Sequence, residues 1–113
     1  MHERQIRMEE WRPGRYVEVA QIRCTSQVLE QILAVEFVQD WEDGLGMAKE
    51  AAFRTVAGRQ FGVVEYLDAP KGPLMFILAL DDPSTVRADL DAALGVLGLP
   101  HSAVVWAHPA ATG

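Results

Sequence analysis

The hydrophobic pattern is clearest in the second half of the chain, where it changes from strand-like to helix-like and back. Two apolar runs, residues 61–67 and 74–80, are joined by the turn-rich segment 68–73, a length typical of connections between antiparallel neighbours. Residues 81–98 carry apolar side chains at helical spacing, and a short apolar run at 103–107 returns as a strand. This order predicts an α+β domain whose sheet ends in a strand that follows a helix.

A strand and a helix are also predicted in the first half. Residues 16–23 contain alternating β-branched side chains, which are typical of a strand, and Thr25 and Ser26 are natural N-cap residues for a following helix. If that helix continued well beyond Ala34, Glu36 would project from the centre of its apolar stripe, where an unpaired carboxylate is costly. Either the helix ends near Ala34, or Glu36 is paired or functional. The expected core stripe is Val28, Leu29, Ile32 and Leu33.

Residues 46–57 fit two alternatives. Their composition favours a second helix that ends at Gly58. However, Gly58 also separates two runs rich in Phe, Val, Thr and Tyr, a pattern typical of a β-hairpin. We favour the hairpin, with a strand over residues 52–57. A helix over 46–57 would instead give the βαββαβ order of a ferredoxin-like domain.

The predicted fold is therefore an α+β domain with an antiparallel sheet of four to five strands and two main helices on one face. Residues 1–14 are expected to form an N-terminal arm or a short first helix that stops at Pro13-Gly14, residues 15–108 the domain, and residues 109–113 a C-terminal tail. The run over 74–80 is apolar on both faces, so a partner, whether identical or not, is expected to cover the face that the helices leave open. With an identical partner, the chain would form a homodimer.

Composition is ordinary for a globular protein, with 113 residues, 50% hydrophobic and 23% charged. No apolar run approaches the roughly 20 residues needed to span a bilayer, and the charged start lacks the apolar centre of a secretion signal. Cys24 is the one cysteine, so no intramolecular disulfide forms, as expected in a reducing compartment. We expect a single cytoplasmic domain that does not interact with membranes.

Charge is distributed unevenly along the chain. Residues 1–23 carry five arginines and four glutamates (+1), and the remainder carries five basic and twelve acidic residues (−7), which together give the net charge of −6. An acidic body repels phosphate backbones. Nucleic-acid binding through the main domain is therefore not expected, and a basic protein partner is.

Residues with reactive or metal-binding side chains do not combine into a site. Cys24 lies between an apolar strand and a helix cap, where a buried structural cysteine is expected. His101 and His108 are separated by a spacing that matches no metal motif, so surface positions are expected. Asp81 and Asp82 precede a helix, where they serve as caps. The sequence predicts no catalytic residues, no metal and no cofactor, which favours a non-enzymatic protein.

Two other carboxylates lie within apolar segments and are expected to face water. Glu65 alternates with Val64 and Tyr66, which places it on the outward face of its strand. In the helix over 81–98, the buried stripe is expected to exclude Asp89. The predicted buried residues of that helix are Val86, Leu90, Ala93, Leu94 and Leu97, and the predicted exposed ones are Arg87, Asp89 and Asp91.

The best candidate for a binding site is the acidic segment around Trp41. Trp41 lies between Asp40 and the pair Glu42-Asp43, beside glycines that predict a surface loop. Tryptophan is favoured at the centre of protein interfaces, and carboxylates attract basic partners. The sequence therefore favours an acidic protein-binding module of the immunity, antitoxin or regulatory type, with Asp40, Trp41, Glu42 and Asp43 as its partner-binding residues.

The alternative function is small-ligand binding. A dimeric ferredoxin-like domain, of the kind found among oxygenases, would form a pocket on its sheet. The residues expected to line it are Phe61, Tyr66, Phe76 and Trp106. A concave apolar cavity with a convergent polar group would favour this alternative, and a flat acidic patch would favour the protein-binding module.

Overall fold

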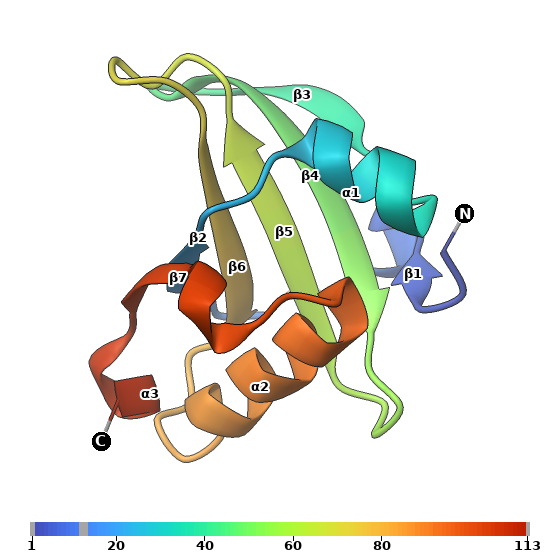
Figure 1. The fold of residues 1–113 in the computed structure, drawn as a ribbon, viewed down its shortest axis with the longest axis vertical. Coiled ribbons are helices and arrows are strands. Elements are labelled where there is room, and N and C mark those ends of the chain that lie inside the picture. The colour runs from blue at the N-terminus through green and yellow to red at the C-terminus, as the bar shows by residue number, and fades with distance from the viewer. Residues whose placement is uncertain (1, 12–13, 113) are drawn as a thin grey trace.

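One antiparallel sheet with helices packed against it makes up the part of the chain, residues 2–11 and 14–112, that the computed structural model describes (Figure 1). Within these residues the strands are β1 (Gln5–Ile6), β2 (Tyr16–Ile22), β3 (Val38–Glu42), β4 (Gly46–Arg54), β5 (Gln60–Tyr66), β6 (Leu74–Leu80) and β7 (Val104–Ala107). The helices are α1 (Ser26–Leu33), α2 (Val86–Leu97) and α3 (Pro109–Thr112), and the 3-10 turns are η1 (Met8–Glu10) and η2 (His101–Ala103). The predicted α+β class is confirmed.

The sheet has more strands than the four to five predicted. Its order is β1-β4-β5-β6-β2-β7, and β3 pairs with β4 beside β1. Five of these strands match the predicted ones. β1 comes from the expected arm and β3 from the expected loop around Trp41, and both form because the outer edge of β4 offers backbone groups that need partners. None of the described helices is long and apolar enough to cross a membrane.

The hairpin at Gly58 is confirmed, and the ferredoxin-like order is wrong. β4 and β5 pair from Ala48 with Tyr66 to Arg54 with Gln60. Gly58 has a φ of 84°, which suits the turn that joins them. The first strand lies earlier than the predicted 52–57, because residues 55–59 are used by the turn, where the Thr55 N–H bonds to the Arg59 carbonyl.

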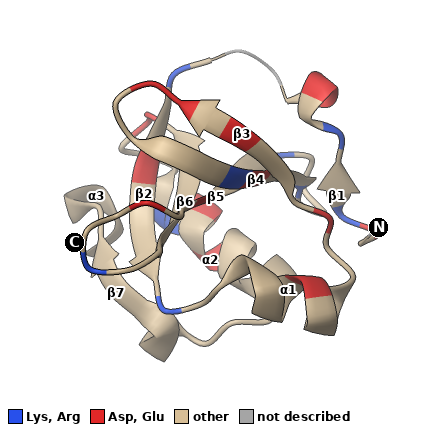
Figure 2. Ribbon diagram, turned by 90° about the horizontal axis from the view of Figure 1, so that it is seen from above, with Lys and Arg blue, Asp and Glu red and all other residues tan. Residues whose placement is uncertain are grey.

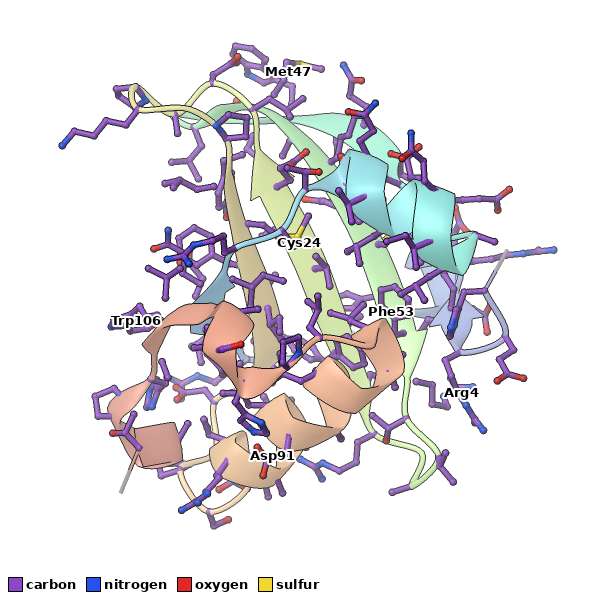
Figure 3. The ribbon with its side chains drawn as sticks, viewed as in Figure 1. Arg4, Cys24, Met47, Phe53, Asp91 and Trp106 are labelled. Carbon is purple, nitrogen blue, oxygen red and sulfur yellow. The ribbon has the colours of Figure 1, made fainter. Side chains whose placement is uncertain are left out.

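Both longer helices lie on the same face of the sheet, as predicted, and the core fills the space between them (Figure 1). Figure 3 shows Phe53 in this layer; its ring stacks on Phe61 at 5.0 Å between ring centres. From β6, alternate residues point into the core, and the others remain half-exposed on the opposite face. The buried residues of α2 include all of the predicted stripe: Val86, Leu90, Ala93, Leu94 and Leu97.

Helix α1 ends at Leu33, which agrees with the alternative in which the helix ends near Ala34. Ala34 adopts the left-handed conformation with a φ of 54° and stops the helix, so Glu36 lies beyond it and is exposed. At the start, the Thr25 hydroxyl accepts a bond from the Val28 N–H, as predicted for the cap. The predicted core stripe is only half right, because Ile32 is 73% exposed on this two-turn helix. Val28 is also exposed, and Leu29 and Leu33 pack inward.

The prediction that Glu65 faces water is wrong. Its side chain points to the helix side and is 3% exposed. One carboxylate oxygen accepts the Ser26 N–H at 3.1 Å and the other accepts the Ser26 hydroxyl at 2.7 Å. Ser26 is the first residue of α1, whose free N–H groups carry partial positive charge. Glu65 therefore joins the centre of the sheet to the start of this helix.

The prediction that Asp89 faces water is also wrong. It was expected in water but is 4% exposed, because Arg59 reaches it from the β4–β5 turn. The Arg59 Nε and Nη2 groups donate to the two Asp89 oxygens, the second at 2.9 Å. Arg87 and Asp91, its predicted neighbours on the water side, are exposed. Each of the two buried acids in this fold thus has charged or polar partners supplied by another element.

The described parts of the predicted arm and tail form regular elements, β1 and η1 in the arm and α3 in the tail. Trp11 from the arm lies against Gly62 of β5, so closely that a Cβ at this glycine would come within 2.9 Å of the indole ring. Pro13, where the arm was expected to stop, lies outside the described residues. In the predicted tail 109–113, α3 packs against α2 through Ala110 and Ala111.

We expect Glu65→Gln to lower the free energy of unfolding by about 1–3 kcal/mol, because the amide cannot accept both Ser26 bonds without leaving a buried polar group unsatisfied. Urea unfolding followed by circular dichroism measures the change. Glu36→Gln, an exposed position with the same chemical change, is the matched control and should have no effect. Equal unfolding midpoints for the two variants would contradict the proposed role of Glu65.

Candidate functional site

None of the described α-helices lies on the face of the sheet opposite α1 and α2, which we call the open face. Residues that pair across antiparallel strands have their side chains on the same face, so the register shows which side chains share it. One row crosses the whole sheet and runs through Glu50, Val64 and Phe76 to Gln21 and Trp106. The next rows add Asp40, Tyr66 and Leu74 on one side and Leu78 and Glu18 on the other.

The floor of the open face is apolar. Val64 is 2% exposed although no helix covers it, because its larger neighbours close over it. Tyr66 and Phe76 meet edge to face with ring centres 5.9 Å apart. Leu74 and Leu78 are half-exposed on the same face. Towards the N-terminal arm the floor is covered by Trp11 and Met8, which leaves the part around Tyr66 and Phe76 uncovered.

Carboxylates surround this uncovered floor. Burial raises the pKa of Glu50 to about 7, and a side-chain hydrogen bond with Glu42 and the charges of Glu42 and Asp40 add to the effect. Burial, followed by the charges of Glu18, Glu42 and Glu50, also raises the pKa of the Tyr66 hydroxyl. The pKa of Glu18 is raised by burial. Figure 2 shows acidic residues on β2 and β3 of this region.

Within residues 2–11 and 14–112, none of the ion pairs involves Glu18, Asp40, Glu42 or Glu50. Every neighbouring charge that acts on the pKa of Glu50 is acidic. Lys49 is next to Glu50 in sequence, but strand alternation turns it to the other face, where its Nζ lies 3.8 Å from Glu30. Among the described arginines, Arg15 lies near Asp81 and Arg59 is bound to Asp89. The open face therefore presents concentrated negative charge around an apolar centre.

The structure divides the predicted partner-binding residues between two faces. These residues were predicted to lie in a loop. Instead, strand β3 contains Asp40, Trp41 and Glu42, and Asp43 lies in the turn that follows. Asp40 and Glu42 pair with Ala48 and Gly46 on the open face, whereas Trp41 pairs with Met47 on the helix side. Trp41 is 60% exposed, as expected for a surface residue. Its indole and the two carboxylates do not form one continuous patch.

The predicted ligand pocket is divided as well. Tyr66 and Phe76 are in contact, and Trp106 lies on the same face in the row of Phe76. Figure 3 shows Trp106 at the outer edge of the sheet on β7, and it is 44% exposed. Phe61, however, is buried on the helix side against Phe53, because it lies on the opposite face of β5 from Val64. The four aromatic residues therefore do not line one cavity.

The remaining candidates are separate from one another. Cys24 is half-buried near the start of α1 (Figure 3); burial raises its pKa, a hydrogen bond to the Thr25 carbonyl lowers it, and the charge of Glu65 raises it. A raised pKa makes the thiol a poorer nucleophile. His101 is exposed, with Nε2 2.9 Å from Asp91. His108 is half-buried, and its Nδ1 accepts the Ala110 N–H.

Asp81 and Asp82 lie at the turn before α2. The Asp82 carboxylate accepts bonds from the N–H and hydroxyl groups of Ser84, which lower its pKa, and its carbonyl accepts the Val86 N–H of α2. Asp81 lies 3.8 Å from Arg15. Asp82 thus orders the start of α2. Over residues 2–11 and 14–112, no group of three His, Cys, Asp or Glu side chains is arranged to hold a metal ion.

Sequence analysis missed Glu18 and Glu50 as members of the site. Glu50 lies in a segment for which helix and strand were both considered, so its neighbours could not be assigned. Once the Gly58 turn pairs Arg54 with Gln60, counting back along both strands places Glu50 beside Val64. That register is the signal that would have found it. Glu18 also required knowing that β2 pairs with β6, a contact between distant segments.

Comparison with known proteins found no matching family model, no matching curated protein and no matching solved structure. The function is therefore argued from the site itself.

We expect Glu50→Gln to stabilise the protein at pH 8, by about 1 kcal/mol because solvent screens a partly exposed carboxylate. The pKa of Glu50 in the folded protein, about 7, lies above its ordinary value of 4.5, so the folded state holds this proton more tightly than the unfolded chain. The contribution of the bound Glu50 proton to the free energy of unfolding is complete below about pH 4.5 and is lost as the pH rises through 7. The gain of the variant should therefore shrink as the pH falls to 5.

Urea unfolding of wild type and Glu50→Gln at pH 5, 6, 7 and 8 measures this dependence. Glu36→Gln, exposed and not among the charges that act on the pKa of Glu50, is the control. A stability difference between Glu50→Gln and wild type that stays constant from pH 5 to 8 would show that Glu50 does not titrate in this range.

Proposed function

We propose that the protein is a non-enzymatic protein-binding module whose open face binds a basic surface of a partner protein. The observation that carries this proposal is the contact between the Glu42 and Glu50 carboxylates on an uncovered apolar floor. Burial and like charge both raise the free energy of the ionised pair. A cation brought in by a partner would lower it.

An arginine side chain is the group that best fits this surface. Its guanidinium spans two carboxylates and donates several hydrogen bonds in one plane. It also packs flat on aromatic rings, and Tyr66 and Phe76 supply these beside the acids. A strongly hydrated lysine ammonium would use the carboxylates but not the ring surface.

The negative charge of the open face favours a partner of opposite charge over a second copy of the chain. A second copy of the chain, placed face to face, would bring two sets of Glu18, Glu42 and Glu50 together, and like charges opposed across an interface cost several kcal/mol. The predicted homodimer would therefore need a different surface. A partner of opposite charge has no such penalty, and acidic residues speed its association. Immunity proteins, antitoxins and regulatory partners are the types of protein that this description fits.

The predicted partner residues retain different roles in this proposal. Asp40 and Glu42 lie on the open face and would contact the basic surface, and Asp43 in the adjoining turn would add to the attraction at a distance. Trp41 lies on the other side of β3, so it would be reached only by a partner that extends around that edge strand. The small-ligand alternative has less support, because Phe61 lies across the sheet from Tyr66 and Phe76.

We expect N-acetyl-arginine amide, as a minimal probe, to shift the NMR signals of Tyr66, Glu50 and Glu42 in a saturable manner, with weak affinity in the millimolar range. The citrulline analogue, which has the same shape without the charge, is the control ligand and should not bind. Glu42→Gln/Glu50→Gln should weaken binding of the arginine probe about tenfold, because the charged acceptors are lost. Shifts that are equal for the two ligands would contradict the proposal.

A protein partner, once recovered by co-purification and reconstituted from purified components, gives a second test. We expect Glu42→Gln/Glu50→Gln to slow its association and reduce the salt dependence of the rate. Trp41→Ala should leave the association rate unchanged, and it should speed dissociation only if the partner extends around β3. If the partner binds the double variant as it binds wild type, the open face is not the binding surface.

A further inference from the structure

A polar pocket of about 430 Å³ lies at the end of the sheet where β4 turns into β5. It is on the far end of β4 from Glu42, because this strand starts beside Glu42 at Gly46 and ends at Arg54. The residues that line it are Tyr16, Arg54, Gly58, Arg59, Gln60 and Leu80. Two of the six are arginines, and there is no acid among them.

Arg59 is held in place from one side. Asp89, which is 4% exposed, accepts bonds from its Nε and Nη2 groups. A guanidinium has five N–H donors on three nitrogens, so the remaining donors are available for another acceptor. The Arg59 side chain is 39% exposed. The buried Asp89 carboxylate orients the guanidinium, and its other edge faces solvent. The Arg59 side chain therefore loses little conformational entropy when it binds a ligand.

Arg54 provides the second positive charge. It pairs with Gln60 across the hairpin, and its N–H donates to the Arg4 carbonyl at 2.8 Å, which fixes its backbone. Among the described residues, no carboxylate lies within 4 Å of its guanidinium. In contrast to Arg59, its charge is therefore not offset by a close acid.

The other walls of the pocket are also polar and supported. The Tyr16 hydroxyl donates to the Gln60 Oε1 at 3.4 Å, and the Gln60 Nε2 donates to the Glu10 carbonyl at 3.3 Å. The Tyr16 ring packs on Trp11 with ring centres 4.2 Å apart. The N-terminal arm thus supports the pocket from behind: the Trp11 ring packs on Tyr16, and the backbone carbonyl of Glu10 accepts the bond from Gln60.

We propose that this pocket binds an oxyanion group, the phosphate or carboxylate of a small molecule, between Arg54 and Arg59. Two arginines that line one pocket can supply guanidinium donors to the several acceptor oxygens of such a group. The volume is within the range of small-molecule sites, about 300–1,000 Å³. Asp89 is a positioning residue that fixes Arg59. This site is separate from the Glu42 and Glu50 carboxylates of the open face and does not depend on them.

Inorganic phosphate is the probe, titrated into the whole protein at constant ionic strength and followed by the NMR signals of the arginine side chains and of the 58–60 backbone. We expect saturable shifts at these residues. Arg54→Gln should weaken binding at least tenfold. Arg15→Gln removes the same charge from a side chain that is 91% exposed and outside the pocket lining, and it should weaken binding less than twofold. Arg59 is left unchanged, because its removal would leave Asp89 buried without a partner.

Acetate in a parallel titration identifies the class of ligand: tighter binding of phosphate indicates a phosphate group, and tighter binding of acetate a carboxylate. Glu42→Gln/Glu50→Gln should bind phosphate as wild type does, which separates this test from that of the open face. Absence of saturation up to high millimolar phosphate, or equal weakening by Arg54→Gln and Arg15→Gln, would overturn the proposal.

Discussion

Both longer helices cover the same face of the sheet, and this one-sided arrangement is the constraint on which the rest of the structure depends. Strand alternation directs every second side chain away from α1 and α2. The same strands therefore form a face that is buried under the helices and a face that is not. On the helix side this gives a core around Phe53, Phe61 and Leu94. On the other side it gives an exposed surface that is partly apolar and is bordered by charge. The candidate sites both lie at the ends of that second surface.

Charge on the open face is separated along the strands. Asp40 and Glu42 of β3 and Glu50 of β4 gather on the part of the face nearer the start of β4, and the arginine-lined pocket lies at its end. The two ends are connected by a floor that includes Val64, Gly62 and Leu78, with Trp11 lying over its lower part. A face of this kind distinguishes the orientation of what approaches it, because a basic group is attracted to one end and an anionic group to the other.

Much of the fold could be predicted from local pattern. The strands over 16–22, 60–66 and 74–80, the capped helix after Thr25 and the stripe of α2 all follow from periodicity and turn residues. The candidate sites and the two buried acids could not be predicted, because their key interactions join segments far apart in sequence. Glu65 meets Ser26 across 39 positions and Arg59 meets Asp89 across 30. Both acids look solvent-facing until the partner that compensates their burial is known.

The outer edge of β4 is occupied by two short strands in succession. β3 pairs with it as far as Glu50, and β1 takes over at Ala52. The Gln5 side chain joins the two, since its amide bonds to both the N–H and the carbonyl of Glu36, just before β3. An unpaired edge strand is a template for pairing with other chains. Residues Gln5 and Ile6 therefore cover the C-terminal half of the β4 edge, and without them its backbone N–H and C=O groups would be open to pairing with neighbouring molecules.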